Sequence, residues 1–440
     1  MNKKERLELA RWAISQAKKN GAGDVAANLS FSRQIEVGVR DGKLENLKES
    51  TQNSLSLNIY VDNRYSGHST NDLRRGSLGR FVEDAVAMTR YLGEDPYRAL
   101  PDPKYYEDQK KIDLKILDPG YSEITSAERV KTAQALTEIA VAQSDKILSS
   151  LAEYSDEYFE DVKVHSNGFV GRREGTSFTG NIEITIDDGA GGKSQDYEYA
   201  KVRFRKDLPA PEMITKKAFR RVMNQIGQAK MESGVYDMVV ENRAAGRLLR
   251  AMAGPLGGRS LQQRSSFLEG KIGQRIGSEK FTMVDDPFVI SGLGSRLFDR
   301  EGMAAKRRVI IDKGILRSYY ISYYYGKKLG MEPTVGTSTN LVFDYGDKSL
   351  EELVAGLQKG ILVTGFIGGN SNSTTGDFSY GIVGAYVENG KVVQPVNEMN
   401  ISGNFTELWN QLTEVGNDPF VYSSWRRPSL RFKDISFSGI

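Results

Sequence analysis

The feature that most constrains the fold is a pattern that recurs about 125 residues further along the chain (174 minus 49). Self-similarity at a fixed spacing marks repeated structural units, so the first half is predicted to contain two helix–strands–helix units. The alternative is that two half-buried strands match because both alternate polar and apolar residues. The aligned pairs are Glu49 with Glu174, Thr51 with Thr176, Leu57 with Ile182, Ile59 with Ile184, Val61 with Ile186 and Asp62 with Asp187.

Local patterns place the elements of each unit. The first is predicted to have a helix over 7–17, strands over 24–34, 35–39 and 54–61, and a helix over 81–88. In the second, Thr125 and Glu128 form a capping box, strands cover 162–165, 177–186 and 197–204, and a helix covers 211–229. Four prolines between 94 and 120 indicate a linker or a long surface connection.

From Val235 onward, short β-branched runs alternate with Gly-containing turns such as Asp312-Lys313-Gly314 and Glu388-Asn389-Gly390. The predicted fold class is therefore α+β: an N-terminal α/β half, built from the two units if the repeat is genuine, and a β-rich C-terminal domain with a curved or barrel-like sheet. The predicted domains are 1–105, 118–230 and 231–440.

Composition excludes several kinds of chemistry. The chain has no Cys and only two His, His68 and His165, which rules out disulfides, iron–sulfur clusters, thiol nucleophiles and thiolate zinc sites. A net charge of +3, from 60 basic and 57 acidic side chains, does not favour direct contact with nucleic acid. The N-terminus is typical of an amphipathic helix, and no apolar run is long enough for a membrane span, so a cytoplasmic location is expected.

Short motifs carry weaker signals. The stretch 191–194 is Gly-Gly-Lys-Ser, but Asp187 occupies the place of the first glycine of a phosphate loop, which favours a polar turn. Tyr323 and Lys327 have the spacing of hydride-transfer enzymes without a dinucleotide loop, which favours aromatic packing. A metal-independent hydrolase, whose catalytic residues no sequence motif identifies, remains a third functional alternative, which replacement of Tyr323, Lys327 and Asp377 by Ala in an activity assay would test.

The segment 365–378 is rich in Gly, Asn, Ser and Thr. Such a stretch leaves backbone donors and acceptors available, which suits the capture of another main chain by strand addition. A disordered surface loop is the alternative.

An ordered set of segments in the second half resembles the TldD/PmbA family, the modulator of DNA gyrase proteins, and the first half fits the two α/β units that precede this domain in the family. The matching segments are 270–276, 284–286, 368–369, 375–378, 388–392, 395–396, 401–405 and 427–430.

The resemblance implies a cytoplasmic zinc metallopeptidase that acts on small or unfolded peptides. Active members carry a His-Glu-x-x-x-His helix and a Cys near the C-terminus, which leave one position on zinc open for water. Here Arg250 and Pro255 stand at the two His positions and Ala251 at the Glu position, and 422–427 has no Cys. Arginine stays protonated and has no lone pair to donate. The chain is therefore similar to the PmbA/TldE branch.

This resemblance predicts a non-catalytic subunit that shapes a peptide chamber and pairs with a zinc-bearing TldD-like chain in a heterodimer or a higher assembly; whether the isolated subunit forms a homodimer is left open by the sequence. No cofactor is expected in this chain, and no membrane or direct nucleic-acid contact. The alternative is a binding protein that regulates DNA gyrase or other partners. The residues predicted to bind peptide are Gly368, Gly369, Asn370, Thr375, Gly376, Asp377, Phe378, Asn400, Gly403 and Asn404.

Overall fold

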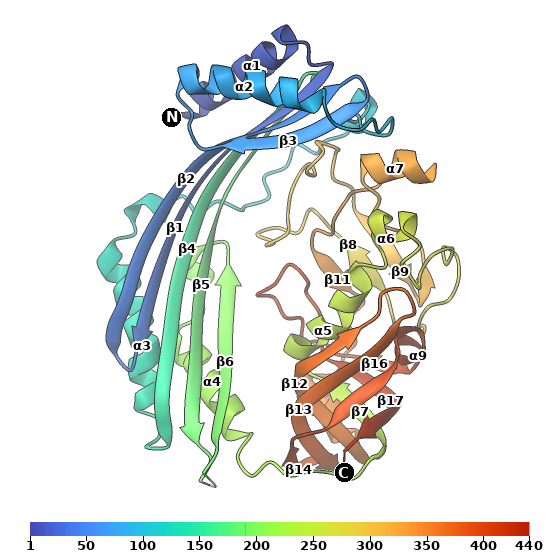
Figure 1. Ribbon diagram of the computed structural model, residues 1–440. Helices are drawn as coiled ribbons and strands as arrows, with labels where there is room; N and C mark the ends of the chain where they lie inside the picture. Colours follow the sequence, from blue (N-terminus) through green and yellow to red (C-terminus); the bar gives the residue numbers. More distant parts are fainter. Residues whose placement is uncertain (190, 440) are drawn as a thin grey trace.

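Residues 1–189 and 191–439 are described by a computed structural model, in which two halves face each other across a cleft (Figure 1). The N-terminal half is a six-stranded antiparallel sheet in the order β3-β2-β1-β4-β5-β6. The C-terminal half contains a closed five-stranded barrel and a separate four-stranded sheet. The predicted α+β class, with a barrel-like C-terminal domain, is confirmed.

Each N-terminal unit runs helix, three strands, helix. The first consists of α1 (Lys3–Lys19), β1 (Asp24–Arg40), β2 (Lys43–Val61), β3 (Arg64–Thr70) and α2 (Arg75–Thr89). The second consists of α3 (Ser126–Val141), β4 (Ile147–His165), β5 (Val170–Asp187), β6 (Lys193–Val202) and α4 (Pro211–Met223). The shift of 125 preserves the cross-strand register, since Ala27 pairs with Leu57 and Ala152 pairs with Ile182. The predicted repeat is therefore genuine.

The first helices of the two units also begin alike. Both α1 and α3 start with a capping box, and a buried arginine follows directly, Arg6 in one and Arg129 in the other. Each arginine is paired with a carboxylate of β4: Arg6 Nε lies 3.4 Å from Glu160 Oε2, and Arg129 Nε lies 2.6 Å from Asp156 Oδ2. Both units are thereby anchored to the same strand, in one continuous sheet. The domain boundaries at 105/118 and 230/231 stay predictions.

The two faces of the sheet differ in polarity. On one face, Val25 and Leu29 pack under α1 and α2, and Val37 and Val39 belong to a core cluster with residues of α3. The other face, which lies toward the C-terminal half, carries polar and charged side chains such as Ser32 of β1. Because side chains alternate along a strand, one set forms the core and the other lines the cleft.

The connection 94–120 is ordered against both halves and contains the short 3-10 helix Pro103–Tyr105, with a second one, Tyr121–Glu123, just after it. The Tyr324 hydroxyl donates to Asp95 at 2.6 Å, and the amide of Ser291 donates to Leu114 O at 2.8 Å. The segment therefore links the first unit to the C-terminal half along its whole length.

In the C-terminal half, β12, β7, β17, β15 and β13 follow one another around the barrel, and pairing of β12 with β13 closes it. Its core includes Trp409, whose ring stacks on Phe281 at 4.2 Å. The strands are β7 (Gly234–Val240), β8 (Met283–Asp285), β9 (Arg308–Asp312), β10 (Ile315–Leu316), β11 (Leu341–Phe343), β12 (Lys359–Ser371), β13 (Asp377–Glu388), β14 (Lys391–Val396), β15 (Asn400–Asn404), β16 (Leu412–Val415) and β17 (Leu430–Ser438). The helices are α5 (Asn242–Ala253), α6 (Gly258–Gln262), α7 (Tyr323–Leu329), α8 (Leu350–Ala355) and α9 (Phe405–Asn410).

Several predicted boundaries are too short. Strand β2 begins at Lys43, not at 54, and β4 begins at Ile147, not at 162. The residues 43–49 of β2 are exposed, so they carry no apolar alternation from which a strand could be predicted. Conversely, α4 ends at Met223 and not at 229. None of the helices in the described residues is long and apolar enough to cross a membrane.

Candidate functional site

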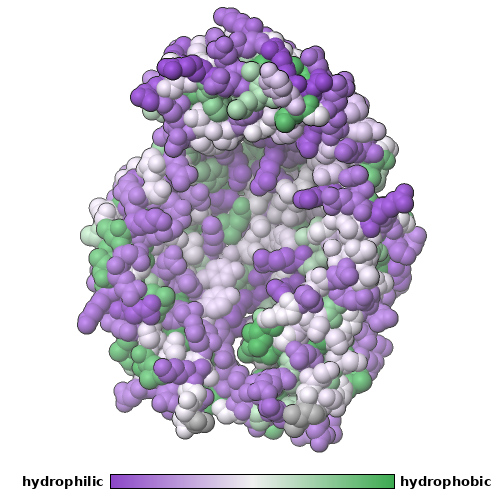
Figure 2. All heavy atoms as spheres, in the orientation of Figure 1, coloured by the Kyte–Doolittle hydropathy of each residue, from purple (hydrophilic) through white to green (hydrophobic). Residues whose placement is uncertain are grey.

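A cleft separates the polar face of the N-terminal sheet from the C-terminal half. It consists of two pockets of about 630 and 670 Å³, which adjoin at Tyr199 of β6, a residue that lines both. In the space-filling view the cleft corresponds to the recessed region near the centre of the molecule (Figure 2). The cleft is the candidate binding site that residues of both halves line.

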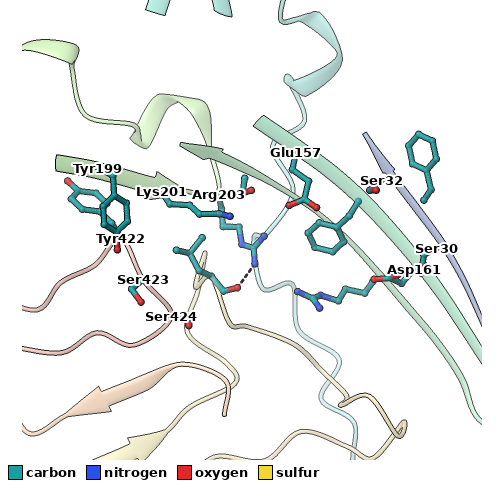
Figure 3. A pocket seen from close by; sticks show the side chains of 15 residues that line it. Ser30, Ser32, Glu157, Asp161, Tyr199, Lys201, Arg203, Tyr422, Ser423 and Ser424 are labelled. Carbon is teal, nitrogen blue, oxygen red and sulfur yellow. Dashed lines mark hydrogen bonds between the residues drawn. The ribbon is translucent and has the colours of Figure 1, made fainter. Parts of the chain in front are cut away.

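The first pocket joins the sheet to the segment 422–424 (Figure 3). Arg203 connects the sheet to another segment of the C-terminal half, because its guanidinium donates to Leu293 O at 2.6 Å as well as to Thr176 O of β5 at 2.9 Å. Burial lowers the pKa of Arg203 to about 10. The pocket is lined by Ser30, Phe31, Ser32, Glu157, Phe159, Asp161, Arg173, Ser177, Tyr199, Lys201, Arg203, Leu293, Tyr422, Ser423 and Ser424.

The second pocket is bordered by α5, the helix that holds the predicted degenerate positions. This helix is strongly amphipathic: Ala245, Leu248 and Leu249 are buried against the barrel, whereas Arg247 and Arg250 are exposed on the other side. Apolar residues at intervals of three and four produce this division. The fold therefore fixes which side chains of α5 face the cleft.

The three predicted positions lie in different environments. Arg250 lines the second pocket, Ala251 is half-buried against the barrel core, and Pro255 is buried in the turn after α5. Ser266 Oγ donates to Pro255 O at 2.7 Å. Of the three, only Arg250 presents a functional group to the cleft.

These residues do not fit a zinc ion. Zinc is bound by His, Cys, Asp or Glu, whereas the positions in question offer a protonated guanidinium, a methyl group and a pyrrolidine ring. Asp196, a carboxylate that lines the same pocket, is already paired with Arg243 at 2.9 Å. Within residues 1–189 and 191–439, no three His, Cys, Asp or Glu side chains are grouped so as to hold a metal ion. No catalytic step through a metal is derived for this chain.

The segment 422–427, which the resemblance associates with a third ligand, does lie against α5. Arg427 packs over Gly246, where an added Cβ would approach Arg427 Nε to 2.7 Å. A side chain at 246 would therefore force the guanidinium of Arg427 to shift. The structure thus brings together the two stretches that the family pattern singles out.

The Gly/Asn/Ser/Thr segment forms a hairpin of β12 and β13, and not a disordered loop. Gly368 and Gly369 form a bulge in β12 with φ values of +56° and +70°, and a Cβ at Gly369 would clash with Ser379 O. Beyond Val363, β12 pairs only with β13, so the edge that faces α5 is open. Arg247 Nη2 donates to Gly368 O at 3.1 Å and to Gly369 O at 3.3 Å across this edge.

The other predicted peptide-binding residues are dispersed around the hairpin. Asn370 is exposed on β12. At the tip, Thr375 and Asp377 are exposed and Gly376 is buried, and Thr375 Oγ1 donates to Asp377 at 2.6 Å. Phe378 is buried, and the centroid of its ring lies 4.7 Å from that of Phe405, with the two rings tilted by 33°.

On the neighbouring strand β15, Asn400 and Gly403 are exposed beside β13. Asn404 caps α9 and donates to Thr375 O at 2.9 Å. Among the predicted residues, Gly368 and Gly369 are the ones joined directly to α5.

The two histidines and the Tyr323–Lys327 pair, which the sequence also offered as candidates, make packing and hydrogen-bond contacts with neighbouring residues. His165 is buried beside Tyr106, and burial lowers its pKa to about 3. His68 contacts Ser66 Oγ at 2.8 Å on β3. Tyr323 and Lys327 contact the connection 94–120, away from the tip of the hairpin that holds Asp377.

The sequence prediction missed most of the residues that line the second pocket. Arg243, Arg247 and Arg250 follow one another at intervals of four and three on α5, a spacing that predicts one charged helix face. Arg427, by contrast, reaches the pocket through the fold of a distant segment, which no local pattern predicts.

Comparison with known proteins matches three consecutive segments of the chain to the three domains of one family. Residues 27–89, 119–226 and 233–439 match, in order, domain 1, the central domain and the C-terminal domain of the PmbA/TldA metallopeptidases. Metalloprotease PmbA of Escherichia coli O157:H7 is 29% identical over 434 residues, which cover 97% of this chain and 94% of that protein.

Solved structures support the same assignment. A candidate modulator of DNA gyrase from Bacteroides thetaiotaomicron VPI-5482 is 42% identical with a TM-score of 0.97, and the match covers 100% of both chains. TldE from Thermococcus kodakarensis shares the fold, with a TM-score of 0.86 at 20% identity, over 98% of this chain and 100% of that one. The resemblance inferred from the sequence is confirmed, and the chain belongs to the PmbA/TldD metallopeptidase family.

Proposed function

We propose that this chain is a non-catalytic, PmbA/TldE-like subunit of a cytoplasmic two-protein zinc metallopeptidase that processes small or unfolded peptides. The observation that carries the proposal is the stretch of α5 and the turn after it, where Arg250, Ala251 and Pro255 stand at the positions that the resemblance assigns to the metal ligands and the base. A metalloprotease TldD homolog of Buchnera aphidicola, 22% identical over 341 residues, illustrates the type of partner. The zinc ion and the catalytic base would belong to that partner.

The role of this subunit would be to form one side of the peptide chamber. Its cleft is open, and beyond Val363 the edge of β12 that faces α5 pairs with no strand of the described residues. Arg247 occupies the carbonyls of Gly368 and Gly369 on this edge, so an added strand would share or displace these two hydrogen bonds. An extended peptide can hydrogen-bond along such an edge regardless of its sequence, because the bonds involve only main-chain atoms. Gly368, Gly369 and Asn370 would therefore contact the peptide, with the hairpin tip and β15 around them.

The test is to measure zinc content and peptide cleavage for the purified chain, alone and after co-expression with a TldD-like chain that carries His-Glu-x-x-x-His. We expect neither zinc nor cleavage for the chain alone, and cleavage with one zinc per heterodimer in the mixture. Stoichiometric zinc together with cleavage by the chain alone would refute the proposal. A complex with gyrase, and none with the TldD-like chain, would support the regulatory alternative.

A further inference from the structure

We propose that the second pocket contains a carboxylate-binding site formed by Arg247, Arg250 and Arg427, which holds the C-terminal carboxylate or an acidic side chain of a bound peptide. The inference rests on the proposed function, because it assumes that the cleft holds peptide, and it adds the chemical class of peptide group that is recognised. The position at which the family pattern places zinc would then serve in this chain as an anion site.

The three arginines converge on one pocket from two segments. Arg247 and Arg250 lie three residues apart on α5 and therefore on the same helix face. Arg427 reaches them from the segment 422–427 over Gly246, and all three line the pocket of about 670 Å³. The charge of Arg250 helps lower the pKa of Arg427, for which burial is the main cause, so the two cations lie near each other.

The positive charge of the three arginines is not balanced by the pocket itself. Asp196 is engaged by Arg243 at 2.9 Å and by Arg221 at 3.5 Å. Two further carboxylates line the pocket: Glu398 is paired with Lys230, and Glu183 adds a small contribution to the raised pKa of Arg40, for which Glu45 is the main cause.

Within the described residues, no carboxylate lies within 4.0 Å of Arg247, Arg250 or Arg427. Like charges that converge on a recessed pocket attract an anion more strongly than isolated charges on an open surface, and here the buried Arg427 lies beside the exposed Arg247 and Arg250.

Two of the guanidinium groups are already held in place. Arg247 lies over the ring of Tyr380 at 4.7 Å while it donates to the two glycine carbonyls of β12. Arg427 is only 6% exposed, lies over Phe420 at 4.6 Å and donates to Trp425 O at 3.1 Å. Its buried Nε has no hydrogen-bond partner within the described residues. Because these groups are fixed before binding, little side-chain entropy would be lost when an anion enters.

The surroundings favour a peptide carboxylate over other anions. Phe366 and Ile367, on the open edge of β12, line the same pocket and offer apolar contact beside main-chain hydrogen-bonding groups. A guanidinium group binds a planar carboxylate through two parallel N–H···O bonds. A peptide that extends along this edge would thus have its carboxylate within the arginine cluster.

The test measures peptide affinity by fluorescence anisotropy with the full-length chain. The probes are an N-terminally labelled Ala/Ser octapeptide with a free C-terminal carboxylate, the same peptide as a C-terminal amide, and the amide with one internal Glu. The variants are R250E, R250K, and R11E as a matched control, since Arg11 is exposed on α1 and does not line the pocket. Circular dichroism verifies that each variant is folded.

We expect at least one carboxylate-bearing peptide to bind tenfold or more tightly than the neutral amide. R250E should abolish this difference, R250K should retain part of it, and R11E should leave it unchanged. The free-acid and Glu peptides distinguish a terminal from a side-chain carboxylate. Equal affinity for all three peptides would refute the carboxylate site and leave the chamber intact, whereas binding of none would contradict both. Competition by inorganic phosphate and by acetate at equal concentrations would assign a general anion site and overturn the peptide assignment.

Discussion

Glu301 lies at the junction of the two halves, where ionisation should weaken the fold. Its Oε2 accepts a hydrogen bond from the Tyr323 amide at 2.7 Å, and the carbonyl of neighbouring Arg300 accepts one from Lys163 of β4. Burial, with a further contribution from the charge of Asp299, raises the pKa of Glu301 to about 7. The folded protein therefore holds a proton that the unfolded chain releases near its ordinary pKa of 4.5.

The direction of the effect follows from proton linkage. Below pH 4.5 both states are protonated, and between pH 4.5 and 7 only the folded state is, so stability falls as pH rises through this window. A pKa difference between about 7 and 4.5 corresponds to at most about 3.5 kcal/mol, at about 1.4 kcal/mol for each tenfold change. E301Q keeps an acceptor oxygen for the Tyr323 amide but cannot ionise. Relative to the wild type, it should therefore gain up to about 3 kcal/mol between pH 5 and pH 8.

The assay is urea unfolding of wild type and E301Q at pH 5, 6, 7 and 8, followed by tryptophan fluorescence. The contribution of Asp299 is present in both proteins and largely cancels in their difference. E351Q is the control, because Glu351 is exposed on α8 and its replacement should give a difference that does not change with pH. A constant difference between E301Q and wild type from pH 5 to 8 would refute the reasoning.

Three further outcomes are expected. D156A should lower the unfolding free energy by about 3–5 kcal/mol, because it leaves the buried guanidinium of Arg129 without its carboxylate. E49Q, at an exposed ion pair, should have a far smaller effect in the same urea titration. G369A should cost at least about 1–2 kcal/mol, measured likewise, because alanine disfavours positive φ and its Cβ would clash with Ser379 O. Treatment with EDTA should leave the melting temperature of the isolated chain unchanged, since no ligand set holds a structural metal within the described residues.

The repeat can be predicted from sequence because the two units pair their strands in the same register, so equivalent positions have the same alternation of buried and exposed residues. A shift of 125 relates residues that alternate on paired strands, and the register of Ala27 with Leu57 recurs as Ala152 with Ile182. The alternative of a chance match between strands does not explain why a buried arginine follows the capping box in both units. The two helices are related by a shift of 123 and not 125, so a single fixed shift over the whole unit fails to align Arg6 with Arg129.

The full strand lengths could not be predicted, for a physical reason. The N-terminal part of β2 is exposed, and β4 is polar toward the cleft, so local hydrophobic periodicity is weak there. These stretches are strands because neighbouring strands supply their hydrogen bonds, which is a tertiary effect. The convergence of Arg427 with α5 depends in the same way on the closed barrel and not on any local pattern.

The two faces of α5 explain why family membership and catalytic activity can separate. Its place in the fold depends on the buried side, where Ala245, Leu248 and Leu249 pack against the barrel. The residues that face the cleft contribute little to this packing, so Arg250 can stand at the position that the proposed function assigns to a ligand without loss of the helix or of the barrel that supports it. Likeness of fold therefore identifies the family, whereas the chemistry depends on a few side chains on the opposite face. A helix that presents metal ligands in one chain can present guanidinium groups in another, on the same scaffold and toward the same cleft.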